Sequence, residues 1–129
     1  MKRIVAFLML IAITFIAVCQ VKDNIQTRIP NYKENDTIKL DDLLKIRNIF
    51  LCDKNYPVVS FVLVYTYSNY DYMMVSNSNN LTEDMKNRLM KFKNMNVKFL
   101  KISFKAITVR TPQNEEIKTR ALKYNLKIK

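Results

Sequence analysis

The sequence predicts a mainly β fold, a small antiparallel β-sandwich with one inserted α-helix. Residues 58–67 are rich in β-branched and aromatic side chains, as in a buried strand. Residues 122–128 alternate between apolar and polar, as in a strand with one solvated face. Between them, residues 82–93 are the one stretch with clear helical spacing. Five or six strands in a chain of 129 residues fit a single sandwich domain.

The N-terminus has the features of an export signal. Lys2 and Arg3 precede an uncharged apolar run of 15 residues, Ile4 to Val18. That run is shorter than the ~20 residues that a membrane-spanning helix needs. Residues 1–19 are therefore predicted to form a cleaved signal peptide that ends at Cys19.

Two alternatives keep the chain attached to a membrane. Residues 16–19, Ile-Ala-Val-Cys, resemble a bacterial lipobox, so lipidation of Cys19 is one alternative. The other is an uncleaved N-terminal anchor. In each case the rest of the chain is expected outside the cytoplasm.

Residues 20–36 are polar and aperiodic and contain Pro30, so they predict a linker before a domain at 37–129. Asp36-Thr37-Ile38 resembles the short O-glycosylation pattern of exported Bacteroidetes proteins. Thr37 is therefore a candidate modification site.

The first half of the domain is expected to contain one helical turn and three strands. The turn is at 41–44, and the strands are at 46–51, 58–67 and 70–75. Strand 58–67 is apolar on both faces, so it should be central and covered on both sides, or covered by a partner. Ser68-Asn69 should form the turn of a hairpin.

The predicted helix has one apolar stripe, formed by Leu81, Met85, Leu89 and Phe92. Either Asn80 or Thr82 is expected to cap its N-terminus. Asp84 is expected to pair with Arg88 one turn later.

Residues 97–107 predict a strand whose apolar phase changes, which indicates a bulge or bend near Phe99-Leu100. Residues 111–114 are expected to turn the chain toward the last strand.

Glycine is absent, so turns that need a positive φ are expected to use asparagine. Candidates between the periodic segments are Asn69, Asn77, Asn79, Asn80, Asn94, Asn96 and Asn114.

The composition restricts the available chemistry. The chain has no histidine and, beside Cys19, only Cys52, which is expected to be a buried, inert thiol. Without glycine there is no glycine-rich phosphate loop. We therefore expect no enzyme, no metal and no cofactor. Acidic pairs at 41–42, 83–84 and 115–116 leave a glycosidase open as an alternative.

The formal net charge is +11, which is compatible with nucleic acid, anionic lipid or an acidic protein. The lysines are dispersed, however, which favours ordinary solvated positions over a binding patch. Export makes nucleic acid an unexpected partner, and membrane contact is expected only through the signal segment or a lipid anchor.

Four tyrosines cluster around the expected hairpin: Tyr65, Tyr67, Tyr70 and Tyr72. Such a cluster is a candidate contact surface, for a protein or for sugar rings. The alternative is that the rings pack at the edge of the sandwich with wet hydroxyl groups.

The order of these motifs resembles a known domain. Val-Val-Ser-Phe (58–61) opens a strand, Asn-Ser-Asn-Asn-Leu-Thr (77–82) opens a helix, and Ile-Ser-Phe-Lys-Ala (102–106) lies in a later strand. This order is similar to the last periplasmic domain of the gliding-motility protein GldM, a family that includes PorM of the type IX secretion system. The resemblance covers roughly residues 37–129.

The resemblance implies an immunoglobulin-like fold and an adaptor of the bacterial cell envelope, periplasmic or associated with the outer membrane, with an envelope protein as partner. Asn94 stands where the family has a glycine, and a second glycine turn falls at Asn114 or Glu115. The GldM family has a membrane helix and several periplasmic domains, whereas this sequence predicts one domain. The expected function is therefore a non-enzymatic interaction module, with glycan binding through the tyrosine hairpin as the alternative.

Overall fold

The computed structural model describes residues 25–129; the predicted signal peptide and Cys19 lie outside this range. The strands and helices run in the order β1 (Thr37–Lys39), α2 (Leu40–Lys45), β2 (Val58–Tyr67), β3 (Tyr70–Ser76), α3 (Glu83–Lys91), η1 (Phe92–Asn94), β4 (Phe99–Arg110), β5 (Glu116–Lys118) and β6 (Leu122–Lys127). The predicted mainly β fold with one inserted helix at about 82–93 is confirmed.

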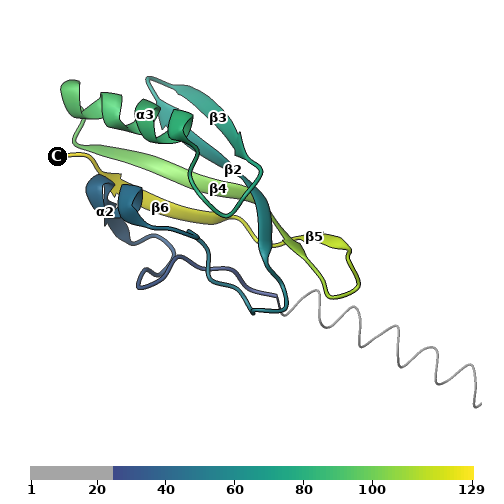
Figure 1. Ribbon diagram of the computed structural model, residues 1–129. Coiled ribbons are helices and arrows are strands. Elements are labelled where there is room, and N and C mark those ends of the chain that lie inside the picture. Colours follow the sequence, from purple (N-terminus) through teal and green to yellow (C-terminus); the bar gives the residue numbers. More distant parts are fainter. Residues whose placement is uncertain (1–24) are drawn as a thin grey trace, which may run out of the picture.

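The strands form one sheet with the order β1-β6-β4-β2-β3, and the short β5 pairs with β4 beside this path. All pairings are antiparallel except β1 with β6. The layer facing the sheet consists of helices and of the segment before β2. Figure 1 shows α3 over the β2–β3 hairpin and α2 beside β6.

The β2–β3 hairpin closes at Ser68-Asn69 as predicted. Both residues have positive φ, 54° and 67°. A two-residue turn with two positive φ angles matches the right-handed twist of the strands that it joins. Tyr67 therefore pairs directly with Tyr70, and the register continues to Phe61 opposite Ser76.

Helix α3 begins at a threonine cap and buries the predicted stripe. The Thr82 hydroxyl accepts a hydrogen bond from the Met85 amide at 3.1 Å, so Thr82 is the N-cap. Asp84 and Arg88 form the expected ion pair at 3.6 Å. Each residue of the stripe is at most 6% exposed: Leu81, Met85, Leu89 and Phe92.

The segment before β2 differs from its prediction. Within the expected linker, Ile29 is fully buried and Thr27 is 7% exposed, so residues 25–36 pack on the domain. The expected strand at 46–51 forms only a single bridge, between Arg28 and Leu51. This segment contributes buried side chains instead of a strand, and Phe50 packs edge-on against Phe61 at a centroid distance of 5.2 Å.

Strand β4 contains the phase change, but at another place than predicted. Its pairing with β2 shifts twice, between Val58 and Ser60 and between Ser60 and Val62. Ala106, opposite the second shift, has a positive φ of 49°. The expected bend near Phe99-Leu100 is therefore wrong, because Phe99 begins the strand and the extra residue is inserted near Ala106.

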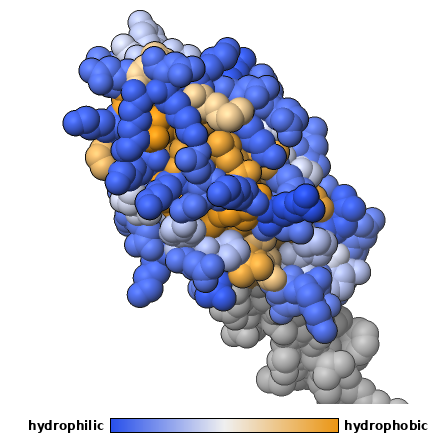
Figure 2. Space-filling view, turned by 60° about the vertical axis from the view of Figure 1, so that its left-hand side comes forward, coloured by the Kyte–Doolittle hydropathy of each residue, from blue (hydrophilic) through white to orange (hydrophobic). Residues whose placement is uncertain are grey.

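One face of the sheet carries the core and the other is open. Phe61, Leu63 and Phe104 are fully buried against the helices and the N-terminal segment. On the opposite face, which we call the outer face, no helix in residues 25–129 joins the packing. On the face that Figure 2 presents, an irregular strip of apolar side chains lies among hydrophilic ones.

Candidate binding surface at the β2–β3 hairpin

The four predicted tyrosines lie on one face of the hairpin. Alternation along β2 places Tyr65 and Tyr67 on the same side. The register sets Tyr72 opposite Tyr65 and Tyr70 opposite Tyr67. All four side chains therefore project toward the side that carries α3.

Packing against α3 and η1 divides the tyrosines into buried and exposed members. Tyr65 stacks on Tyr72, with ring centroids 5.1 Å apart and planes 14° apart, and meets Phe92 edge-on at 5.6 Å. Tyr67 also meets Phe92 edge-on, at 5.2 Å. Tyr65 is only 5% exposed, whereas Tyr72 is 38% and Tyr70 69% exposed. Tyr65 thus belongs to the core, and Tyr70 and Tyr72 present the accessible rings.

A groove of about 330 Å³ lies between the hairpin and α3. We call it the tyrosine groove; it is lined by Tyr65, Tyr67, Tyr72, Asp84, Arg88, Lys91, Phe92 and Met95. Aromatic faces form its floor, and two cations and one carboxylate form its helical wall. Because Asp84 already pairs with Arg88, Lys91 is the lining cation without an ion pair in the described part of the chain. An acidic or aromatic group fits this lining.

Strand β3 borders the groove and is an edge of the sheet. A two-residue turn makes Tyr67 and Tyr70 a hydrogen-bonded pair, in which the Tyr67 carbonyl accepts from the Tyr70 amide. Along the hairpin, hydrogen-bonded pairs then alternate with pairs that are not hydrogen-bonded. Tyr72 and Met74 therefore bond to β2. Asp71, Met73 and Val75 turn their backbone N–H and C=O groups to the free edge.

This edge lacks the usual protection against added strands. Natural edges are blunted by lysine, proline or a bulge. β3 contains neither lysine nor proline, and its register with β2 is unbroken. Met73 and Val75 are 68% and 62% exposed. The sequence predicted the strand but not its edge position, which depends on strand order.

The remaining predicted site residues are dispersed. Thr37 is exposed at the start of β1, which is one edge of the sheet, whereas the tyrosines lie on β2 and β3 at the other edge. Cys52 is half-buried, and burial raises the pKa of its thiol above the usual value, so the thiol stays protonated at neutral pH.

The three acidic pairs do not converge. Asp41 pairs with Lys93, Glu83 with Lys86 at 3.6 Å, and Glu116 with Arg110 at 3.5 Å. The Lys93 ammonium, which donates a hydrogen bond to Asp41, holds the pKa of that carboxyl below its usual value. Asp84 pairs with Arg88 as well, so these carboxylates belong to separate surface ion pairs.

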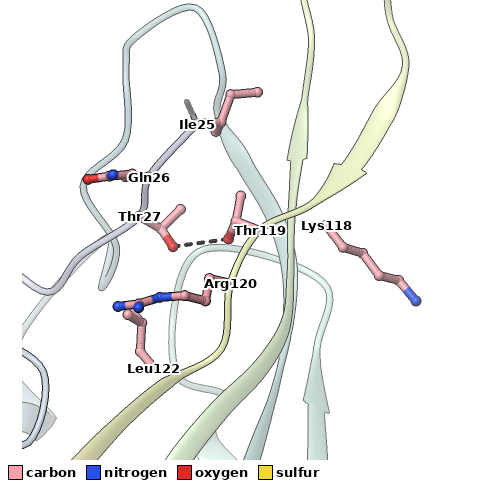
Figure 3. A pocket seen from close by; sticks show the side chains of 7 residues that line it. All are labelled: Ile25, Gln26, Thr27, Lys118, Thr119, Arg120 and Leu122. Atoms are coloured by element: carbon pink, nitrogen blue, oxygen red, sulfur yellow. Dashed lines mark hydrogen bonds between the residues drawn. The ribbon is translucent and has the colours of Figure 1, made fainter. Parts of the chain in front are cut away.

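A second hollow, of about 400 Å³, lies at the start of the described segment (Figure 3). Across it, the Thr27 and Thr119 hydroxyl groups are hydrogen-bonded at 3.1 Å. The Thr119 hydroxyl also donates to the Ile107 carbonyl at 3.2 Å. These bonds tie the N-terminal segment to the β5–β6 connection, so this polar cluster has a structural role.

In residues 25–129, no group of three or more acidic, cysteine or histidine side chains is arranged to hold a metal ion. No helix in that range has the length and apolar character to cross a bilayer. No protein-family model matches the chain, and no curated protein matches it either.

Proposed function

We propose that this protein is an exported, non-enzymatic adaptor of the bacterial cell envelope that binds an extended segment of a partner protein along β3. The observation that carries the proposal is the unprotected edge of β3 beside the tyrosine groove. An added strand would take up the outward backbone groups of Asp71, Met73 and Val75, as in other cases of β-strand addition.

The surroundings of the edge suggest the chemistry of the partner segment. Side chains of an added strand alternate between the two faces. On the α3 side they would meet Tyr70, Tyr72 and the cation of Lys91; on the outer face they would meet Met73 and Val75. An extended segment with acidic or aromatic residues on one side and apolar residues on the other fits best.

The envelope location and the family assignment rest on the sequence. The apolar run before Cys19 supports export, and the order of motifs over 37–129 resembles the last periplasmic domain of GldM. A one-sheet domain with a free edge is compatible with an adaptor role, whereas fold alone does not define function.

Proline at position 73 tests the strand-addition proposal. The Met73 amide points to the free edge, so Met73→Pro removes an outward donor without removing a bond to β2. Met73→Ala is the matched control, because it shortens the side chain and keeps the amide. Both variants and the wild type are used for affinity capture from native envelope membranes.

We expect one envelope protein to be captured by the wild type and by Met73→Ala, and to be lost with Met73→Pro. Circular dichroism checks that each variant is folded. Capture of no specific envelope protein, or equal capture by a folded Met73→Pro variant, would count against strand addition.

Glycan binding is a second candidate, favoured by the exposed Tyr72 ring over the groove. Sugar rings stack on exposed aromatic faces. A glycan array should then give a signal that Tyr70→Ala and Tyr72→Ala abolish. An empty array, or a signal that both variants retain, would exclude it.

A further inference from the structure

The outer face of the sheet is strongly basic. The register places five lysines on it, from β1, β4 and β6: Lys39, Lys101, Lys105, Lys123 and Lys127. Two acidic side chains lie on the described strands of this face, Asp71 and Glu116. The Asp71 carboxylate accepts a hydrogen bond from Thr66 at 2.6 Å, and Glu116 pairs with Arg110. The lysines look dispersed in the sequence, but the strand order gathers them.

These five lysines are not neutralised within residues 25–129. None of them takes part in the ion pairs found there. Lys39 even lies directly opposite Lys127 in the β1–β6 register. Like charges directly opposite each other destabilise a sheet. An anionic partner would relieve this repulsion.

The basic patch is broad and shallow. Lys105 is four positions after Lys101 along β4, and Lys127 is four positions after Lys123 along β6. Four positions along a strand correspond to roughly 13 Å. A depression of about 400 Å³ lies between these lysines, with Lys101 and Lys123 in its lining. No helix of residues 25–129 packs here, so the patch can meet a flat surface.

Exposed apolar side chains border the lysines. Phe99 is 59% exposed and lies opposite Lys127. Met73 and Val75 are exposed on β3 at the other side of the face. Apolar side chains among cations are typical of surfaces that enter the headgroup region of a bilayer.

The kind of cation distinguishes a bilayer from a protein partner. All five charges are lysines, which act as hydrated point charges on flexible stems. Lysine is depleted in protein–protein interfaces, where arginine is enriched. Single-stranded nucleic acid would need aromatic rings for stacking, and Phe99 is the one ring on the strands of this face.

We propose that the outer face binds the surface of an anionic lipid bilayer. This contact uses another face than the tyrosine groove and adds membrane attachment to the proposed adaptor. It also goes beyond the sequence, which predicted membrane contact only through the N-terminal segment or a lipid anchor.

Vesicle sedimentation with the full chain tests the proposal. The probes are vesicles of phosphatidylcholine and vesicles of equimolar phosphatidylglycerol and phosphatidylcholine. The difference in affinity between the two removes any charge-independent contribution from the rest of the chain. The test variant is Lys101→Gln/Lys105→Gln/Lys123→Gln. The control, Lys45→Gln/Arg47→Gln/Lys54→Gln, removes as many exposed charges from α2 and the loop after it.

The wild type should prefer the anionic vesicles, and added salt should weaken that preference. The outer-face triple variant should lose on the order of a hundredfold in affinity, from about 1 kcal/mol per lysine at a charged membrane surface. The control variant should lose much less. Circular dichroism verifies that both are folded.

Three results would overturn the proposal. The first is a wild type without preference for anionic vesicles. The second is an equal loss in both triple variants, which would make net charge alone responsible. The third is an outer-face triple variant that loses affinity for duplex DNA and keeps its affinity for anionic vesicles, which would assign the face to nucleic acid.

Discussion

Asn79 holds Phe50 in place with both ends of its side-chain amide. The amide nitrogen donates to the Phe50 carbonyl at 2.9 Å, and the amide oxygen accepts from the Phe50 N–H at 3.0 Å. The side chain thus acts as a short strand partner for a segment that otherwise pairs only through the bridge between Leu51 and Arg28 in the described residues. Phe50 in turn packs edge-on against Phe104 at 5.1 Å.

Replacing Asn79 should therefore destabilise the whole domain. Asn79→Ala leaves the Phe50 amide and carbonyl without these partners, which costs about 1–3 kcal/mol. Urea denaturation measures the change in the free energy of unfolding. Asn77→Ala, at an exposed position in the same connection, is the control and should change it little. Equal effects of the two substitutions would contradict this role of Asn79.

Ile29 tests whether residues 25–36 belong to the domain. Its side chain is fully buried in the core cluster. Ile29→Ala should lower the free energy of unfolding by about 2–5 kcal/mol, since it leaves a cavity. Gln26→Ala, at an exposed position, is the control. A change below about 0.5 kcal/mol for Ile29→Ala is typical of surface positions and would mean that the segment is a linker after all.

Ala106 has a backbone conformation that favours glycine. Its φ is 49°, and a side chain with a Cβ pays about 1–2 kcal/mol in that region. Glycine avoids this steric cost but loses more conformational freedom on folding than alanine does. The difference between the two effects should let Ala106→Gly stabilise the fold by up to about 1 kcal/mol. Ala121→Gly, at a position without a positive φ, should destabilise it. Thermal denaturation compares them, and a destabilising Ala106→Gly would refute the bulge geometry.

The Asp41–Lys93 pair should make stability depend on pH in the acid range. The pKa of Asp41 is lowered in the fold, chiefly by the hydrogen bond from Lys93 and then by its charge. Stability from the pair is therefore fully present above the ordinary carboxyl pKa and is lost as the pH falls through the lowered one.

Melting temperatures of the wild type and Asp41→Asn should accordingly converge as the solution is acidified. The effect is small, because the pair is exposed to solvent. Asp42→Asn, beside it and without an ion pair in the described residues, is the control. A constant difference between the wild type and Asp41→Asn at all pH values would show that the charge pair is not responsible.

Local patterns predicted the elements whose signals lie within one segment. Strand β2, its two-residue turn, the stripe of α3 and the alternation of β6 were all evident from spacing. The tyrosines shared one face because strand alternation and hairpin register require it. Their division into a buried Tyr65 and an exposed Tyr70 depends on where α3 packs, which spacing does not reveal.

The rest depends on contacts between distant segments. Ile29 and Phe50 are buried by strands that follow them in the sequence. Ile29 lies in a stretch that looks polar and aperiodic, and Phe50 lies in a short apolar run that predicts a strand. Of the seven candidate asparagines for a positive φ, the prediction holds at Asn69 and Asn114 and is wrong at five: Asn77, Asn79, Asn80, Asn94 and Asn96. Asn31, Asn35 and Asn48, which pattern did not single out, also have a positive φ. Asn79 and Asn80 instead use their side chains to hold residues 48–50.

Amide hydrogen exchange of the domain, free and with its captured envelope partner, tests the adaptor proposal most directly. Strand addition predicts that the amides of Asp71, Met73 and Val75 exchange fast in the free domain and slowly in the complex. The amides of Tyr72 and Met74, which already bond to β2, should change little. A complex in which those three amides still exchange fast would contradict binding along β3.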